Sequence, residues 1–202
     1  MGFDRVFALS DAVATWAARV GGYAILASAV LVAADVILRK AFDLSFGGAD
    51  ELSGYAFAIG TTWAFSYALF RRAHIRIDVV YRALPRPARA WLDVVGLLAL
   101  GLFAALLAYH GGKVLQQTLL LGATANTPLR TPLWIPQTVW LLGLAWFVYT
   151  IALVLARSCW GLARRDYDLV RELAGAAEAG GGELGADIPG TGGGPSPAGR
   201  PR

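Results

Sequence analysis

The stretch Leu133–Ala156, LWIPQTVWLLGLAWFVYTIALVLA, contains no Asp, Glu, Lys, Arg or His. A helix of this length, rising 1.5 Å per residue, reaches across the roughly 30 Å hydrocarbon core of a bilayer. Lipid tails offer no hydrogen-bond partners to backbone groups, so a single segment that crosses them must be helical. The stretch therefore predicts a transmembrane helix.

Three further windows have the same character, namely Val20–Leu38, Leu52–Phe70 and Val94–Gly112. Apart from Asp35 and His110, they carry no acidic, basic or histidine side chain. Only 16% of the 202 residues are charged, whereas soluble domains average about 25%. Too little polar surface remains to cover four such helices in water. The predicted fold class is therefore an all-α membrane protein with four transmembrane helices.

The Lys and Arg residues predict the orientation of these helices. Twelve of them lie in the N-terminal segment, in residues 71–93 and in the part of the tail next to the membrane, against four in the other two loops. Cytoplasmic loops carry the excess of positive charge in membrane proteins. Both termini are therefore expected in the cytoplasm. The same pattern accounts for the net charge of +4 without nucleic-acid binding.

The segments outside the four spans divide into three kinds. Residues 1–19 have apolar side chains at helical spacing and predict a cytoplasmic interfacial amphipathic helix, and Ile75–Leu84 has a similar pattern. Residues 161–173 predict a short cytoplasmic helix. Residues 174–202 are rich in Gly and Pro with few large apolar side chains, so a disordered tail is expected there.

The second span carries two interleaved rows of small residues at four-residue spacing. One row contains Gly54 and Ala58 and continues through Thr62 and Ser66. The other is made of Ala56, Gly60, Ala64 and Ala68. Small side chains let helix backbones approach closely in lipid. The rows favour packing inside the four-helix unit, and docking of another membrane subunit is the alternative.

Asp35 is a carboxylate inside an apolar span, which is costly without a partner. Arg39 lies four residues later and shares its helix face, so the two are expected to form an ion pair. With Asp50 and Glu51, which begin the second span, the pair favours a structural cluster that joins spans one and two. Contact with a transported ion or substrate, or with a partner subunit, is the alternative. A structural pair predicts that Arg39→Ala is more damaging than Asp35→Ala, because the short carboxylate cannot extend to the interface.

The two histidines, His74 and His110, invite a haem or quinone site. In the predicted topology they lie on opposite sides of the membrane and cannot ligate one iron together. The single cysteine, Cys159, excludes an internal disulfide and a multi-cysteine metal site. No nucleophile with a neighbouring base is apparent in any span. We therefore predict no cofactor, no metal and no enzymatic activity.

Four stretches of the chain together point to a known family. The first span ends in Asp35–Arg39 (DVILR), and the second opens with Asp50–Ser53 (DELS). The second closes with Arg71–Asp78 (RRAHIRID), and the third loop reads Thr127–Pro136 (TPLRTPLWIP). In order and spacing, residues 16–160 resemble the small membrane subunit (DctQ-like, the Q component) of tripartite ATP-independent periplasmic (TRAP) transporters.

This resemblance implies a function and partners. Such a subunit scaffolds a large permease subunit, the M component, for sodium-driven uptake of an organic acid across the bacterial inner membrane. A periplasmic substrate-binding protein, the P component, delivers the substrate, and membrane lipids surround the pair. In this picture His74, Arg76 and Asp78 shape the cytoplasmic rim after the second span. A small membrane anchor of a quinone- or haem-linked redox complex is the alternative function.

Overall fold

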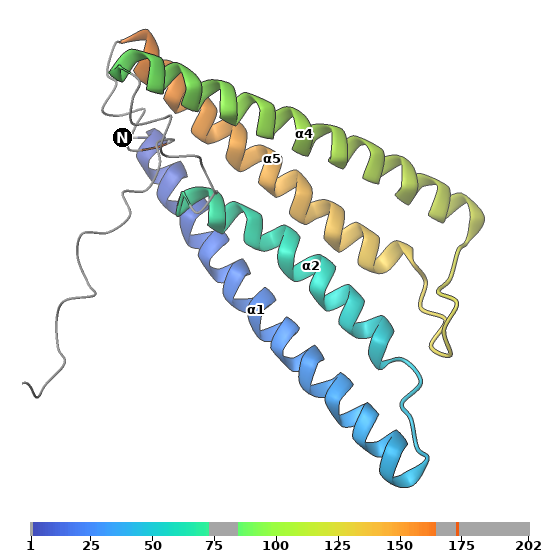
Figure 1. The fold of residues 1–202 in the computed structure, drawn as a ribbon. Coiled ribbons are helices and arrows are strands. Elements are labelled where there is room, and N and C mark those ends of the chain that lie inside the picture. Colours follow the sequence, from blue (N-terminus) through green and yellow to red (C-terminus); the bar gives the residue numbers. More distant parts are fainter. Residues whose placement is uncertain (1, 73–84, 165–172, 174–202) are drawn as a thin grey trace, which may run out of the picture.

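The computed structural model describes residues 2–72, 85–164 and 173 of the chain. Four long α-helices make up most of this part: α1 (Gly2–Phe42), α2 (Ala49–Phe70), α4 (Arg86–Leu121) and α5 (Trp134–Ala163). Within the described residues there is no β-strand, only one isolated bridge between Thr124 and Pro132. The prediction of an all-helical fold is therefore confirmed (Figure 1).

The helices pack in the order α1, α2, α5, α4, with each neighbour pair in close contact. Figure 1 shows all four running side by side, closest together near the N-terminus of the chain and farther apart at the opposite end. The α1–α2 loop and the α4–α5 loop both lie at that opposite end, which we call the loop end. The other end, which contains the N-terminus and the start of α4, is called the N-terminal end.

The core lies where α2, α5 and α4 meet. Ser66 of α2 and Thr150 of α5 are completely buried there, and their hydroxyl oxygens lie 3.1 Å apart. Apolar side chains from the same three helices surround this polar contact; they are Leu69, Leu97, Ala104, Phe147, Ile151 and Val154. A buried hydroxyl needs a partner because burial without one is costly. The Thr150 hydroxyl also donates to the carbonyl of Phe147 on its own helix at 2.8 Å, and its contact with Ser66 marks the register at which α2 packs on α5.

The helices extend beyond the predicted spans, and α1 and α4 do so most. α1 contains 41 residues and is about 61 Å long, and α4 contains 36 and is about 54 Å long at 1.5 Å per residue. The interfacial helix predicted at 1–19 and the span predicted from Val20 belong to one continuous helix, α1, without a break between them. Likewise α4 continues past Gly112, the last residue of the predicted span, and ends at Leu121, where Gly122 adopts a left-handed conformation with φ of 58°.

The bounds of α2 and α5 agree more closely with the predicted spans. α2 begins three residues before the predicted Leu52 and ends at Phe70, as predicted. α5 begins at Trp134 and continues beyond Ala156 to Ala163, so it includes the start of the predicted short helix 161–173. Most of that short helix, the amphipathic stretch Ile75–Leu84 and the tail 174–202 lie outside the described residues.

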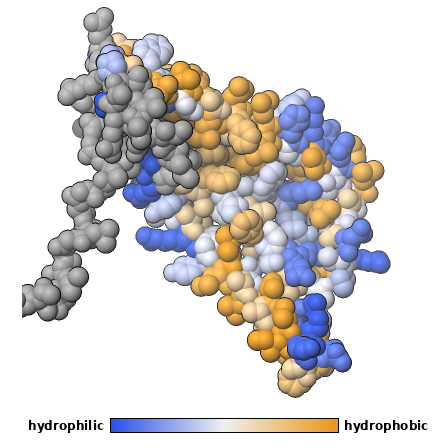
Figure 2. Space-filling model, viewed as in Figure 1, coloured by the Kyte–Doolittle hydropathy of each residue, from blue (hydrophilic) through white to orange (hydrophobic). Residues whose placement is uncertain are grey.

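Three of the helices are long and apolar enough to cross a membrane, with windows inside Arg5–Phe42, Pro87–Leu121 and Trp134–Ala163. α2 is not among them, because Gly, Ser, Thr, Tyr and Trp take the place of strongly apolar side chains along much of its length. Large hydrophobic residues are exposed along the outer faces of α1 and α4, far beyond the few hundred Å² usual for a soluble monomer. Figure 2 shows hydrophobic residues over much of one face and hydrophilic ones toward the helix ends. The chain is therefore a multi-pass membrane protein.

Candidate functional site

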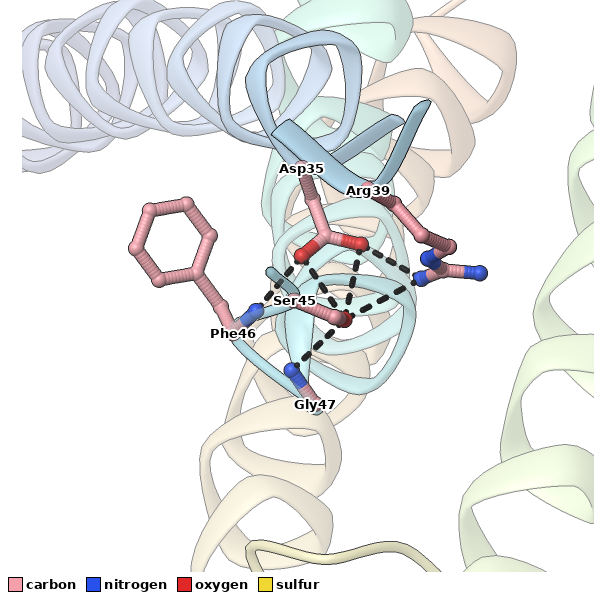
Figure 3. Close-up of polar contacts among 5 residues, drawn as sticks. All are labelled: Asp35, Arg39, Ser45, Phe46 and Gly47. Atoms are coloured by element: carbon pink, nitrogen blue, oxygen red, sulfur yellow. Dashed lines mark hydrogen bonds and ion pairs between the residues drawn. The ribbon is translucent and has the colours of Figure 1, made fainter. Parts of the chain in front are cut away.

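Asp35, near the end of α1, is the centre of a hydrogen-bond network at the loop end. Its side chain is only 4% exposed. One carboxylate oxygen, Oδ1, accepts hydrogen bonds from the backbone N–H of Phe46 at 2.7 Å and from the Ser45 hydroxyl at 3.0 Å. The other, Oδ2, accepts from Nη2 of Arg39 at 2.5 Å. The predicted ion pair between Asp35 and Arg39 is therefore confirmed (Figure 3).

The partners of Asp35 show what the network holds in place. Ser45 and Phe46 belong to the α1–α2 loop, and the Ser45 hydroxyl also accepts a hydrogen bond from the N–H of Gly47 at 3.1 Å. Gly47 has a positive φ of 68°, which glycine adopts without strain. The Arg39 side chain is 58% exposed and lies on the outside of the network. The carboxylate thus ties the end of α1 to the loop that leads into α2.

Glu51 does not join this network. The sequence predicts it in one cluster with Asp35, Arg39 and Asp50, whereas its hydrogen bonds are made elsewhere. Its carboxylate is buried in the first turn of α2 and accepts a hydrogen bond from the Tyr55 hydroxyl at 2.8 Å. It also accepts one from the hydroxyl of Thr127, in the α4–α5 loop. This carboxyl lies just before the predicted span 52–70. Hydrogen bonds from the side chain of Thr127, and next from that of Thr131, hold its pKa below the ordinary value of 4.5. Glu51 therefore joins α2 to the α4–α5 loop.

The two loops at the loop end also touch each other directly. A Cβ atom at Gly48 would lie 1.5 Å from Cδ1 of Leu129, and one at Gly47 would lie 3.4 Å from Pro128. Leu129 and Pro128 form the tip of the α4–α5 loop, which is closed by a hydrogen bond from the Ala125 N–H to the Thr131 carbonyl at 3.0 Å. Asp35, Glu51 and these contacts therefore join all four helices through one layer of loops.

The small-residue rows of α2 contact two different helices. Gly60, from the row of Ala56, faces Gly21 and Ile25 of α1. Thr62, from the row of Gly54, is buried against Gly143 of α5, where a Cβ would come within 2.9 Å of the threonine hydroxyl. Internal packing, the favoured interpretation of the rows, therefore accounts for their central residues.

Gly54 and Ala58 lie nearer the loop end of α2 and are less enclosed. Gly54 is exposed, and a Cβ there would meet nothing within 4 Å. Ala58 is half-buried, and its carbonyl oxygen accepts a hydrogen bond from the Thr62 hydroxyl at 3.0 Å. The described residues therefore leave Gly54 without an internal packing role.

Contacts at the N-terminal end were not apparent from the sequence. Arg71, directly after α2, lies 3.5 Å from Asp11 of α1, and the rings of Phe7 and Phe70 pack edge to face with centroids 5.1 Å apart. The guanidinium of Arg157 lies over the Phe7 ring at 5.8 Å. The first turns of α1 thus pack on the ends of α2 and α5. Nothing local in residues 1–19 distinguishes such packing from adsorption to a membrane surface.

The remaining candidates are placed as follows. His110 is exposed on α4, its ring 5.3 Å from that of Tyr109. Among the described residues there is no group of three or more His, Cys, Asp or Glu side chains that would suit a metal ion. His74, Arg76 and Asp78 lie outside the described residues, so their predicted role at the cytoplasmic rim stays a prediction.

Comparison with known proteins places most of the chain within a known family. A family described as "Tripartite ATP-independent periplasmic transporters, DctQ component" matches residues 28–164. The match covers the end of α1, all of α2, α4 and α5, and both loops at the loop end. No curated protein and no solved structure shows significant similarity to the chain.

Proposed function

The chain belongs to the DctQ component family of TRAP transporters, and we propose that this small permease subunit scaffolds the large permease subunit during sodium-driven uptake of an organic acid. Membership places the chain among transporter components rather than enzymes. Such a transporter in general combines it with a large permease and a binding protein. The family match is the observation that carries the proposal.

The proposal includes a topology. We place four crossings in the bacterial inner membrane, with α2 as the fourth, and both termini in the cytoplasm. The loop end then faces the periplasm. The excess of Lys and Arg toward the N-terminal end supports this orientation. α2 is not among the three helices with a strongly apolar window, but it packs between α1 and α5 and has less contact with lipid.

The Asp35 network supports a structural role for its residues. Each carboxylate oxygen already accepts hydrogen bonds from the protein, one from the Phe46 backbone and the other from the Arg39 guanidinium. A site that binds and releases sodium offers oxygen ligands to the ion, whereas here the ligands are occupied by N–H and O–H donors. We therefore assign Asp35, Arg39 and Glu51 to holding the scaffold in shape.

The scaffold role also suits the way the helices are joined. A subunit that moves substrate across a bilayer needs a stationary partner at a fixed depth. The chain fixes its helices to one another by the buried Ser66–Thr150 contact and by the loop layer around Asp35 and Glu51. Family membership favours transport over the redox-anchor alternative, which no described contact supports.

Affinity purification tests the proposal. The tagged chain, expressed with a large permease subunit of a TRAP transporter from the same source, should recover that permease from detergent-solubilised membranes in a fixed ratio. A binding protein loaded with its organic acid should then add to the complex. Recovery of the chain alone, with normal expression of the permease, would contradict the scaffold role.

A further inference from the structure

The end of α5 carries a stripe of basic and aromatic side chains. It consists of Arg157, Trp160 and Arg164, the last of which directly follows the helix. Steps of three and four residues put these side chains on one face of a helix. Arg157 is the first charged residue after the charge-free run Leu133–Ala156. The stripe therefore begins where α5 leaves the apolar part of the bilayer.

Two members of the stripe are stacked on each other. The Arg164 guanidinium lies over the Trp160 ring, 4.5 Å from its centroid. Trp160 is 59% exposed, and Arg164 is exposed as well. The attraction between a guanidinium and the face of an indole comes from the charge and does not require the N–H donors. The stack therefore positions those donors while leaving them available for hydrogen bonds.

A second stacked arginine at the N-terminal end of the bundle differs in this respect. Arg71 lies over the Tyr67 ring at 5.2 Å, and its Nη2 is also 3.5 Å from the Asp11 carboxylate and from the Thr15 hydroxyl. Within the described part of the chain, Arg164 forms no ion pair and no side-chain hydrogen bond. Of these two stacked arginines, Arg164 is therefore the one whose donors can take an external ligand.

The charge around the stripe favours an anion. α5 contains no Asp or Glu from its first residue to its last. Arg157 and Arg164 are seven residues apart, which is about 10 Å along the helix, and long arginine side chains reach across such a distance. The guanidinium of Arg157 lies over the ring of Phe7 of α1 at 5.8 Å. Two positive charges thus border Trp160, and α5 supplies no carboxylate to neutralise them.

The position of the stripe indicates which anion it meets. Trp side chains collect at the level of lipid headgroups, where the ring contacts the upper acyl chains and its N–H meets polar groups. Trp91, near the start of α4 at the same end of the bundle, is also 59% exposed. Clustered basic side chains directly beyond a span attract anionic lipids. A lipid phosphate is therefore the anion that lies at the height of Trp160 and Arg164.

We propose that Trp160 and Arg164 form a binding site for an anionic phospholipid. The Arg164 guanidinium donates hydrogen bonds to the phosphate oxygens, and Arg157 adds a second positive charge. The Trp160 ring holds the guanidinium and contacts the glycerol and the first part of an acyl chain. The proposed topology assigns this lipid to the cytoplasmic leaflet. The site itself does not depend on the large permease, so it can be tested on the chain alone.

Lipid titration of the purified full-length chain in a neutral detergent tests the site, with bound lipid measured by native mass spectrometry. Dioleoyl-phosphatidylglycerol should bind more tightly than dioleoyl-phosphatidylcholine. Arg164→Gln should weaken the binding of phosphatidylglycerol about fivefold, through loss of one arginine–phosphate contact. Arg130→Gln removes the same charge from the exposed tip of the α4–α5 loop and should leave binding unchanged. Equal weakening by both variants would overturn the proposal, because it would show a response to net charge alone.

Substitutions of Trp160 test the stacking. Trp160→Phe should keep most of the affinity for phosphatidylglycerol, because a ring remains beneath the guanidinium, whereas Trp160→Leu should weaken binding. Without lipid, thermal unfolding of these variants and of Arg164→Gln should match that of the wild-type chain, since both side chains are exposed. Added phosphatidylglycerol should stabilise the wild-type chain more than Trp160→Leu or Arg164→Gln. Equal stabilisation of all three would contradict the site.

Two further measurements identify the occupant. Inorganic phosphate should not displace phosphatidylglycerol from the wild-type chain, because the site also contacts the glycerol and acyl chain. Displacement would mean that the site takes a soluble anion instead. In membranes that contain the chain and the large permease, benzoylphenylalanine at position 160 should crosslink to lipid on irradiation. An adduct with the large permease, or between two copies of the chain, would overturn the proposal.

Discussion

Gly21 of α1 and Gly60 of α2 mark the closest approach of two helix backbones: a Cβ atom at Gly21 would lie 2.9 Å from Cα of Gly60 and 3.0 Å from its carbonyl oxygen. Atoms of the backbone cannot move aside as the end of a side chain can. Close approach of this kind gives the dense packing that holds helices together in lipid. The pair therefore sets the distance between α1 and α2.

Substitution of Gly21 tests this contact. Gly21→Ala should destabilise the chain by about 1–3 kcal/mol, because the added methyl forces the two backbones apart. Gly22→Ala is the control, since a Cβ at Gly22 meets nothing within 4 Å. It should leave stability unchanged or raise it by up to about 1 kcal/mol, as Ala favours helix over Gly. Thermal unfolding in detergent measures both, and equal effects would contradict the close-approach role.

From the sequence alone, Arg39→Ala is expected to destabilise the chain more than Asp35→Ala. The hydrogen bonds of Asp35 reverse this expectation. Asp35→Ala should be more damaging than Arg39→Ala, because it removes the acceptor of the Phe46 N–H and of the Ser45 hydroxyl together. After Arg39→Ala the carboxylate still has both of those donors. Thermal stability and protease resistance of the α1–α2 loop measure the difference. A larger effect of Arg39→Ala would mean that the ion pair, rather than the loop contacts, governs this site.

The buried contact between Ser66 and Thr150 should show energetic coupling. Ser66→Ala and Thr150→Val each remove one hydroxyl, and the double variant removes both. A double-mutant cycle on unfolding free energy should give a coupling of about 0.6 kcal/mol, the average for such contacts between membrane helices. Thr138→Val is a control, since its hydroxyl bonds only to the carbonyl of Trp134 on its own helix. Additive losses from Ser66→Ala and Thr150→Val would contradict the register role.

The sequence predicted the helices well because charge-free runs have to be helical in lipid. Two of the helices, α1 and α4, continue through paired glycines that lie at the predicted span boundaries. At Gly21 and Gly111 the missing side chain serves helix packing, against Gly60 and against Trp140 respectively, and the helix continues. Hydropathy reports which residues enter the membrane, whereas the end of a helix depends on its capping and packing.

The site was predicted only where its contacts are local. Asp35 and Arg39 are four residues apart on one helix, so their pairing follows from helical geometry. Glu51 meets Thr127 across 76 residues of sequence, and Asp35 meets Phe46 through the path of a loop. Neither contact leaves a periodic signal in one sequence. The predicted cluster of Asp35 with Glu51 was therefore incorrect, although each residue does hold the loop end together.

The proposed topology predicts which parts of the chain each side of the membrane can reach. Reporter fusions after Leu173 should be active in the cytoplasm, and fusions within the α4–α5 loop should be active in the periplasm. A fusion in the α1–α2 loop should also report periplasm if α2 crosses the membrane. Cytoplasmic activity at that loop would contradict the orientation. Fusions at residues 45 and 73, before and after α2, that report the same side of the membrane would contradict the fourth crossing.

Uptake into proteoliposomes tests the central claim most directly. The large permease is reconstituted with and without this chain, a sodium gradient is imposed, and uptake of a labelled organic acid is measured with its loaded binding protein outside. The account predicts sodium-dependent uptake when both subunits are present and almost none without the chain. Equal uptake by the large permease alone, at the same orientation and protein density, would contradict it.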